Sequence, residues 1–331
     1  MMRFARSLTT QVALAALALA TPLSAQTQIT PADAHGVATG EIEPAALQQD
    51  AAAEHGSARE IDIQHHIANA HELELPFGTV VHLPQWAPIH IGPVVLDLSP
   101  TKHTVFMLLA ALIVGLVFIW TGSVVRRAER AGKPPKGFAG SMEAMALYIR
   151  QEVVLPNVGH HGEGFAPYLL TLFFFILVMN LLGLLPWGAT ATGNIAVTAA
   201  LALISFIVIE VAGMRALGPK GYLGTIFYLP PGLPTALKPI MLVIMTPVEI
   251  IGKLSKPFAL AVRLFANMTA GHVLVLALIG LTFLFQSWAV GIGASILATG
   301  IMLLELFVAF LQAFVFTLLT SVFIGLMRAE H

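Results

Sequence analysis

Long apolar stretches, separated by short polar segments, make up the chain from about residue 100 to its end. Three of these stretches occupy residues 103–122, 165–186 and 195–214. Each is close to the length of about 20 residues that a helix needs to cross the hydrocarbon core of a bilayer. The pattern therefore predicts three membrane-spanning helices in this part of the chain.

Two longer segments follow, over residues 239–286 and 287–327. The second contains a single charged residue, Glu305, and no polar turn divides it. A straight helix of that length would measure about 60 Å, roughly twice the hydrocarbon thickness. We expect it either to lie strongly tilted or to break at a glycine; the candidates are Gly291, Gly293 and Gly300. The predicted fold class is an all-α polytopic membrane protein with about five membrane helices, the last two forming a long hairpin.

Basic residues indicate which ends of the predicted spans face the cytoplasm. Five of them follow the first span, and the later segment 215–238 has three basic residues and no acidic one. An excess of Lys and Arg beside a span is typical of cytoplasmic loops. We therefore expect the N-terminal segment outside, the C-terminus inside, and the amphipathic residues 138–154 along the inner surface. The five basic residues are Arg126, Arg127, Arg130, Lys133 and Lys136.

The first hundred residues divide into two parts, ahead of a membrane domain over residues 100–331. Residues 1–25 combine two arginines, a short apolar run and a small-residue site, which predicts a secretory signal peptide that is cleaved. Residues 26–99 hold ten acidic residues and seven histidines, and we interpret them as a solvated extracytoplasmic segment. Within it we expect a short helix over residues 61–75 and two strands, at 79–83 and 94–98.

Composition agrees with a membrane protein and excludes several other classes. Hydrophobic residues make up 57% of the 331 residues and charged residues only 11%, against about 25% charged in a typical soluble domain. The formal net charge is −1, so no global field would attract a nucleic acid. The chain has no cysteine, and the pair His65-His66 has no second ligand pair at a diagnostic spacing. We expect no disulfide, metal site or cofactor.

The few polar and charged residues at membrane depth are informative, because an ionisable group there costs several kcal/mol unless it faces a partner or water. On a helix that turns 100° per residue, five of them lie within about 40° of one direction. They are Glu249, Lys253, Lys256, Arg263 and Asn267. The segment over residues 239–286 therefore carries one polar face.

The last two segments bring further polar groups to the same depth. Glu305 and Gln312 are seven residues apart, which places them on one face of a helix. In an antiparallel hairpin, Arg263, Asn267 and Gln312 would form one group. His272 and Glu305 would form a second.

Several of these residues also have an ordinary structural explanation. Lys253 and Lys256 can extend their amines to the inner surface. Glu249 can support Lys253 at a spacing of four residues, and Glu210 can be interfacial. Arg263 differs, because a guanidinium keeps its charge in a protein and a long apolar stretch follows it. Its place beside titratable groups predicts a proton or ion path, with the arginine as an electrostatic barrier.

Three motifs resemble those of subunit a of the F-type ATP synthases. They are LSKPFALAVRLFANMTAGH at residues 254–272, LQAFVF at 311–316 with the preceding Glu305, and MNLLGLLP at 179–186. They follow one another in the order found in that family, and the resemblance covers roughly residues 100–331. The arginine motif is highly specific to the family.

This resemblance implies a proton-translocating stator subunit with no nucleotide site of its own. Arg263 matches the essential arginine, which faces the carboxylates of a rotating ring of c subunits and blocks leakage between two offset half-channels. His272 and Glu305 match the pair of the outer half-channel, with histidine and glutamate in the reverse order of some members. Glu249 matches an acid of the inner half-channel. The polar neighbours of the arginine are matched by Asn267 and Gln312.

The resemblance also implies a location and partners. The last two helices would be steeply tilted and wrapped against the c-ring, in a bacterial inner membrane, with b-type peripheral stalk subunits and the remaining subunits of the complex. Two alternatives stay open, a sodium-translocating version of the same subunit and a secondary ion-coupled transporter, although we find no internal repeat of the transporter kind. A nucleotide-hydrolysing pump is not favoured, because Gly252-Lys253 would end a phosphate loop whose first glycine falls at Pro247.

Overall fold

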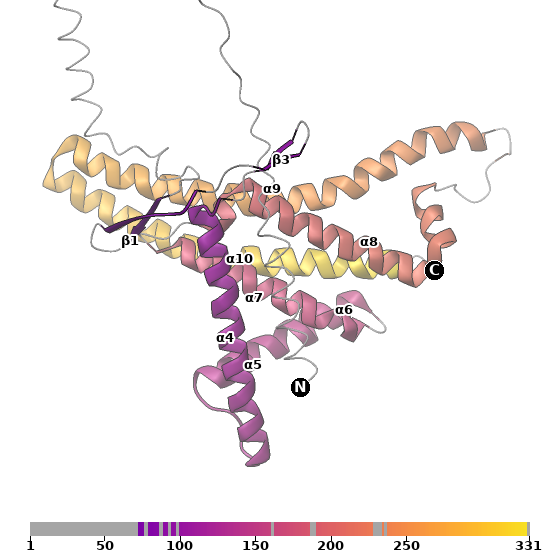
Figure 1. Cartoon of the computed structure of the whole chain (residues 1–331), viewed down its shortest axis with the longest axis horizontal. Helices are drawn as coiled ribbons and strands as arrows, with labels where there is room; N and C mark the ends of the chain where they lie inside the picture. The colour runs from indigo at the N-terminus through magenta and orange to yellow at the C-terminus, as the bar shows by residue number, and fades with distance from the viewer. Residues whose placement is uncertain are drawn as a thin grey trace, which may run out of the picture.

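The structure is a computed structural model, and it describes residues 72–75, 79–85, 89–91, 94–96, 99–159, 162–185, 190–227, 234 and 237–329. The predicted signal peptide and the pair His65-His66 lie outside these residues. Five of the described helices are long and apolar enough to cross a membrane, which confirms the predicted all-α polytopic class. They are α4 (Lys102–Arg130), α7 (Ala166–Gly183), α8 (Ile195–Ile226), α9 (Lys238–Phe285) and α10 (Trp288–Ala329) (Figure 1).

A group of shorter helices connects α4 to α7. It consists of α5 (Phe138–Tyr148), the π-helical turn η1 (Ile149–Val154), α6 (Leu155–Val158) and the 3-10 turn η2 (Gly162–Gly164). The prediction of a helix over residues 138–154 is therefore confirmed, with a π-helical end. The helix α4 runs beyond the predicted end of the first span and includes the first basic residues of the cluster, because arginine and alanine are good helix formers.

One prediction about the later segments is wrong, and one of two alternatives is excluded. The predicted loop over residues 215–238 is helical as far as Ile226, with a break at Gly218, whose φ of 72° suits glycine. Pro219 follows that break and can start the new helical turn, where its missing N–H costs nothing.

The glycines at 291, 293 and 300 do not break α10, which is one helix from end to end. A glycine inside a helix costs only about 1 kcal/mol. Packing of α10 along α9 compensates for that cost, and a Cβ added at Gly291 would lie 3.2 Å from the Thr282 side chain of α9. The alternative of a broken helix is therefore excluded, which leaves a single long one.

Two small hairpins precede the helices. Strands β1 (Glu72–Leu75) and β2 (Thr79–His82) pair antiparallel, and so do β3 (Ile89–Ile91) and β4 (Val94–Leu96). The strand predicted at 79–83 is confirmed over Thr79–His82 and the one predicted at 94–98 over Val94–Leu96, while residues 97–98 lie outside the described residues. The predicted helix over 61–75 is wrong for its last four residues, where the alternation of Glu and Leu has the period of a strand.

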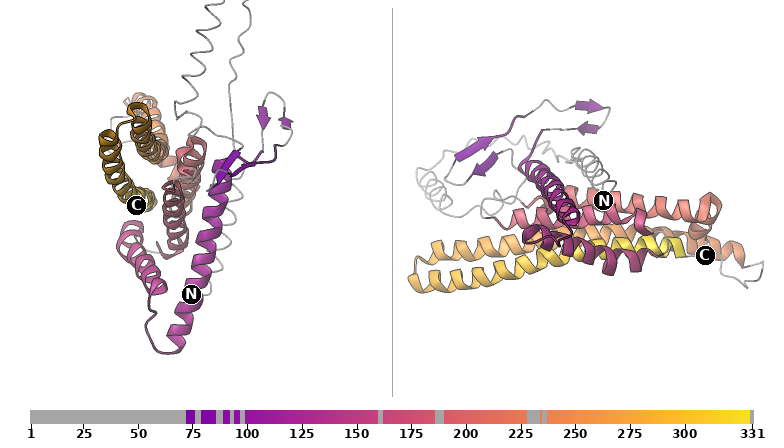
Figure 2. Two further views of the ribbon diagram at one scale, coloured as in Figure 1. Left: turned by 90° about the vertical axis from the view of Figure 1, so that its left-hand side faces the viewer. Right: turned by 90° about the horizontal axis from the view of Figure 1, so that it is seen from below.

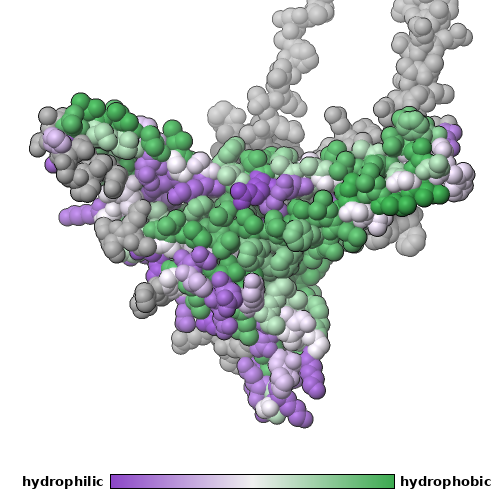
Figure 3. Space-filling model, turned by 180° about the vertical axis from the view of Figure 1, so that it is seen from behind, coloured by the Kyte–Doolittle hydropathy of each residue, from purple (hydrophilic) through white to green (hydrophobic). Residues whose placement is uncertain are grey.

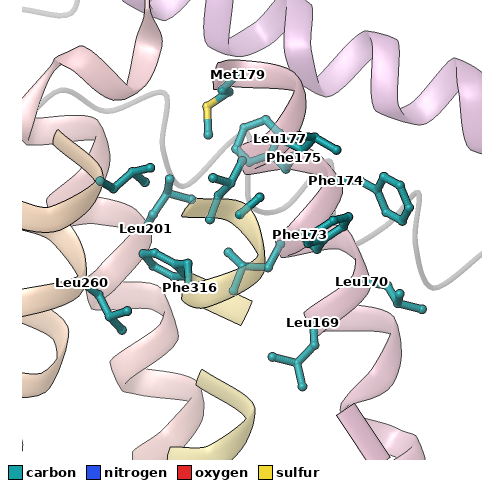
Figure 4. Packing of buried hydrophobic residues seen from close by; sticks show 14 of the residues in the cluster. Leu169, Leu170, Phe173, Phe174, Phe175, Leu177, Met179, Leu201, Leu260 and Phe316 are labelled. Atoms are coloured by element: carbon teal, nitrogen blue, oxygen red, sulfur yellow. The ribbon is translucent and has the colours of Figure 1, made fainter. Parts of the chain in front are cut away.

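The core is built around α7, which is apolar on all sides. Its Phe173, Ile176 and Met179 are fully buried. Side chains of the other long helices close over them, including Leu201 of α8 and Phe316 of α10 (Figure 4). A helix that is hydrophobic all round occupies the centre of a helical protein. Among the long helices, α7 packs mainly against α4 and α10, and α8 and α9 pack in turn against α10 and against each other.

The hairpin of α9 and α10 is long and largely unsupported on its outer side. It extends across the direction of α4, and its connected end reaches far beyond α7 and α8 (Figures 1 and 2). In the most apolar stretch of α9 only 6% of the residues are buried, against 72% in α7. The chain therefore presents a broad apolar face on α9 that its own described residues do not cover.

The first prediction concerns the close approach of α10 to the connecting segment. A Cβ added at Gly325 would overlap the backbone oxygen of Asn157. We expect Gly325→Ala to lower the stability of the detergent-solubilised protein by about 1–3 kcal/mol, as overpacking does. The measurement is the midpoint of thermal unfolding.

Gly300→Ala is the matched control, because nothing lies within 4 Å of a Cβ added there. Alanine has the higher helix propensity, so this midpoint should stay the same or rise slightly. Equal midpoints for the two variants would contradict the predicted overlap.

Candidate functional site

Arg263 lies on the outward face of α9. The opposite face of the same turns packs against the other helices, since Leu264 and Met268 are fully buried. Arg263 and Asn267 are exposed, and so is Phe258, one of the large apolar side chains of this face. The single guanidinium thus stands on a surface that is otherwise mainly apolar.

The Arg263 guanidinium has no anionic partner within the part of the chain that the structure describes. The ion pairs in that part of the chain join Arg150 to Glu163 and Lys253 to Glu210. Because arginine does not lose its proton in a protein, it cannot avoid the cost of burial in a membrane by becoming neutral. The arrangement therefore requires an anion or water from outside the described residues.

Glu305 of α10 lies against Gly271 of α9. Its side chain is buried, with 6% exposure, and a Cβ added at Gly271 would be only 2.7 Å from its Oε1 atom. Since His272 is the next residue, this contact places the carboxyl group at the level of the half-buried imidazole. Glycine at position 271 is what allows the carboxylate to lie against the α9 backbone.

Gln312 differs in exposure from the other two members of the group predicted around the arginine. Its side chain is 3% exposed, whereas Arg263 and Asn267 face outward. Its helix neighbour Ala313 is fully buried in the main core. The amide therefore belongs to the packed interior of the hairpin, and the guanidinium to its open surface.

A network of polar groups that the sequence analysis did not assign lies at the end of the helices that the basic residues predict to be extracytoplasmic, and we call it the outer network. It centres on η3 (Ala191–Gly193). Thr192 donates a hydrogen bond to Asn180 Oδ1 (2.8 Å), and Asn180 Nδ2 donates one to the Ala309 carbonyl of α10 (3.2 Å). The ring of His103 on α4 lies within hydrogen-bond distance of the Thr190 carbonyl (3.1 Å). Three helices are thus joined through one short turn.

Two hydroxyl groups beside this network have no hydrogen-bond partner in the described part of the chain. They belong to Thr190 and to Thr269 of α9. Both flank Gly193, since a Cβ added there would lie 3.5 Å from Thr190 Cβ and 3.8 Å from Thr269 Oγ1. Buried hydroxyl groups of this kind are commonly satisfied by water. Asn180 could have been found from the sequence, because it is an amide within an apolar run; the threonines gave no such signal.

A second polar cluster lies at the other end of α8 and α9. The Lys253 amine donates a hydrogen bond to Thr225 Oγ1 (2.8 Å) and lies 3.8 Å from Glu210 Oε2. It is also 4.7 Å from the centre of the Tyr222 ring, whose hydroxyl donates a hydrogen bond to that same carboxylate oxygen. Lys253 and Glu210 are both buried, at 7% and 9% exposure.

This cluster corrects the structural explanations given to its members. Lys253 does not extend to the surface, and its ion partner is Glu210 of α8 rather than Glu249. Lys256 packs its amine over the ring of Phe323 on α10 at 5.1 Å. The reason is the burial of one side of α9 against α8 and α10, which a helix taken alone does not reveal.

Within the described residues there is no group of three or more side chains that could hold a metal ion. The polar groups are instead distributed along α9 and its neighbours, from the cluster around Lys253 past Arg263 to the outer network. Figure 3 shows one face of the molecule, on which hydrophilic residues gather at the lower tip and in a band across a largely apolar body.

Comparisons with known proteins relate the chain to one family. A family model described as ATP synthase A chain matches residues 104–325. The chain is 45% identical over 272 residues to the ATP synthase subunit a of Chloroherpeton thalassium, covering 82% of this chain and 78% of that protein. It is 46% identical over 313 residues to that of Chlorobium phaeobacteroides strain BS1, covering 91% and 88%.

A relative from another bacterium has the same description as the two relatives above. The ATP synthase subunit a of Anaeromyxobacter dehalogenans is 41% identical over 320 residues, covering 90% of this chain and 81% of that protein. The matches include the long helices and all the polar residues of α9 and α10 described above.

The second prediction tests the outer network. Asn180→Leu would leave the Thr192 hydroxyl and the Ala309 carbonyl without their present partner. We expect stability to fall by about 1–3 kcal/mol, the usual cost of unsatisfied buried groups. The measurement is again thermal unfolding in detergent.

Thr320→Val serves as control, because the fully buried Thr320 hydroxyl bonds only to Phe316 of its own helix. Its loss leaves no donor unpaired, so the effect should be much smaller. If the two variants lose the same stability, the network does not join the helices as described.

Proposed function

This chain belongs to the ATP synthase A chain family, and we propose that it conducts protons within the stator of an F-type ATP synthase. In this role it would provide two offset half-channels to the carboxylates of a rotating c-ring. Proton flow through them would drive rotation and ATP synthesis. Membership of the family disfavours the alternative of a secondary transporter.

The observation that carries the proposal is the position of Arg263. It is a permanent cation on an exposed apolar helix face, with no anion among the described residues of its own chain. A ring of c subunits would supply both the apolar surface that covers α9 and the anion that the arginine lacks. Lipid would supply the first but not the second.

A fixed cation in this position would also separate the two half-channels. Moving one elementary charge across 100 mV is worth about 2.3 kcal/mol, which a continuous proton path would dissipate. A positive charge midway repels protons and attracts a deprotonated ring carboxylate. Each proton would then have to travel with the ring, which couples transport to rotation.

The outer half-channel would use His272 and Glu305. The Glu305 carboxyl group lies against Gly271, one residue from the imidazole. An imidazole binds and releases protons near neutral pH, so this pair suits the loading of a proton. Asn267 and Gln312 would act as polar neighbours of Arg263, one on the open surface and one inside the hairpin.

The inner half-channel would use Glu249, which is half-buried near the inner end of α9. Its orientation follows from the basic residues after the first span, which favour a cytoplasmic location for that end. We accordingly place the chain in a bacterial inner membrane with its C-terminus inside. Its partners there would be the c-ring and b-type peripheral stalk subunits.

The third prediction tests the arginine. Arg263→Ala in the assembled complex should abolish ATP-driven proton uptake by inside-out vesicles, because nothing would then separate the half-channels or attract the ring carboxylate. The measurement is quenching of a pH-sensitive dye in sodium-free buffer. The amount of subunit in the purified complex shows whether assembly is retained.

Arg215→Ala is the control, since Arg215 is another exposed arginine of a membrane helix but lies on α8. It should pump as the wild type does. Coupled pumping by Arg263→Ala would refute the proposed function, and pumping that requires sodium would replace the proton by that ion.

The fourth prediction tests whether His272 and Glu305 act as a pair. His272→Glu and Glu305→His should each lower proton pumping at least about tenfold, because one of the two group types is lost. The double variant retains one imidazole and one carboxylate in contact. It should therefore pump better than either single variant.

The comparison is a double-mutant cycle on pumping rates, normalised to the amount of assembled complex. A pair gives a double variant that recovers activity. If the losses of the two single variants simply add in free energy, the residues act independently and the pairing is wrong.

A further inference from the structure

The buried cluster around Lys253 connects α9 to both parts of α8. Glu210 precedes the break at Gly218, whereas Tyr222 and Thr225 follow it. All three contact the Lys253 ammonium group. Glu210 forms the ion pair, Tyr222 offers its ring face and Thr225 accepts the hydrogen bond. Lys253 therefore contacts α8 on both sides of its break.

The same ammonium group has a second possible partner on its own helix. Glu249 precedes Lys253 by four residues, and glutamate four residues before lysine is the favourable order for a helical ion pair. In the structure this pair does not form, and Glu249 has no ion partner among the described residues. Lys253 instead forms its ion pair with the buried carboxylate of Glu210.

The choice between the two carboxylates has a chemical consequence. A carboxylate held by an ammonium group binds a proton less readily, since the opposite charge favours its ionised form. Glu210 is further fixed as an acceptor by the Tyr222 hydroxyl, which bonds to the oxygen nearest Lys253. The Lys253 charge is thus compensated by Glu210 within the cluster, and Lys253 does not form an ion pair with Glu249.

We propose that Glu210 is a positioning residue that holds the Lys253 ammonium on α8 and so keeps Glu249 free to exchange protons. This inference rests on the inner half-channel role proposed for Glu249. It adds that the role depends on a carboxylate of a different helix, which never meets the proton path itself. The ion pair between α8 and α9 is then a condition for proton exit.

The experiment compares three variants of the assembled complex: Glu210→Gln, Lys253→Met and the two combined. Passive proton flux is measured through the membrane sector in vesicles, after removal of the nucleotide-binding sector. Glu210→Gln should reduce flux about tenfold, because the released lysine pairs with Glu249 and one nearby opposite charge changes proton affinity by at least that factor. The combined variant has no lysine to release, so flux should recover to at least half of the wild-type value.

Lys253→Met alone should also retain at least half of the flux, which distinguishes a competing charge from a clamp that merely holds the helices together. Glu163→Gln is the control, since Glu163 forms an exposed ion pair with Arg150 (3.4 Å) away from the cluster. It should leave the flux unchanged. The amount of subunit in each purified complex corrects for assembly.

Two outcomes overturn the inference. One is normal flux in Glu210→Gln, and the other is a loss that removal of Lys253 does not restore, which would make the cluster a structural clamp. Either would leave the proposed function intact if Arg263→Ala still abolishes coupled pumping. Coupled pumping by Arg263→Ala would instead remove the proposed function itself.

Discussion

A guanidinium group that cannot become neutral is the constraint on which the rest of this structure depends. Arg263 stands on the open face of a membrane helix whose opposite face is fully packed. Its charge cannot be removed by deprotonation, and water and protein are the only surroundings that compensate it at acceptable cost. A chain with such a residue needs an anion or water from outside the described residues to compensate the charge.

Several other polar groups of the membrane region have their partners within the chain. Lys253 is compensated by Glu210, and Asn180 joins Thr192 to the backbone of α10. The Asn180 contacts join α7 to α10, and the Lys253 contacts join α9 to α8. The outward face of α9 is left uncovered by the described residues.

Much of the fold was predictable because a membrane imposes a local rule. A stretch of apolar residues of the right length becomes a helix whatever its neighbours are, since its backbone must bond within itself. The expectations that failed concern places where contacts between helices, and not the local sequence, set the backbone conformation. The chain continues as helix beyond Gly218 and through the glycines of α10, because packing against α9 stabilises turns that the sequence marks as weak.

The sequence by itself determined the family, the five long helices and the identity of the unusual polar residues, because each depends on residue type and spacing along one helix. It also predicted that Glu305 and His272 lie at one level, which helix geometry can indicate. Only the tertiary structure decided which carboxylate holds Lys253, which side of α9 is buried and which is open. Those outcomes depend on distances between separate helices, and the interval between residues 210 and 253 along the chain contains no information about such a distance.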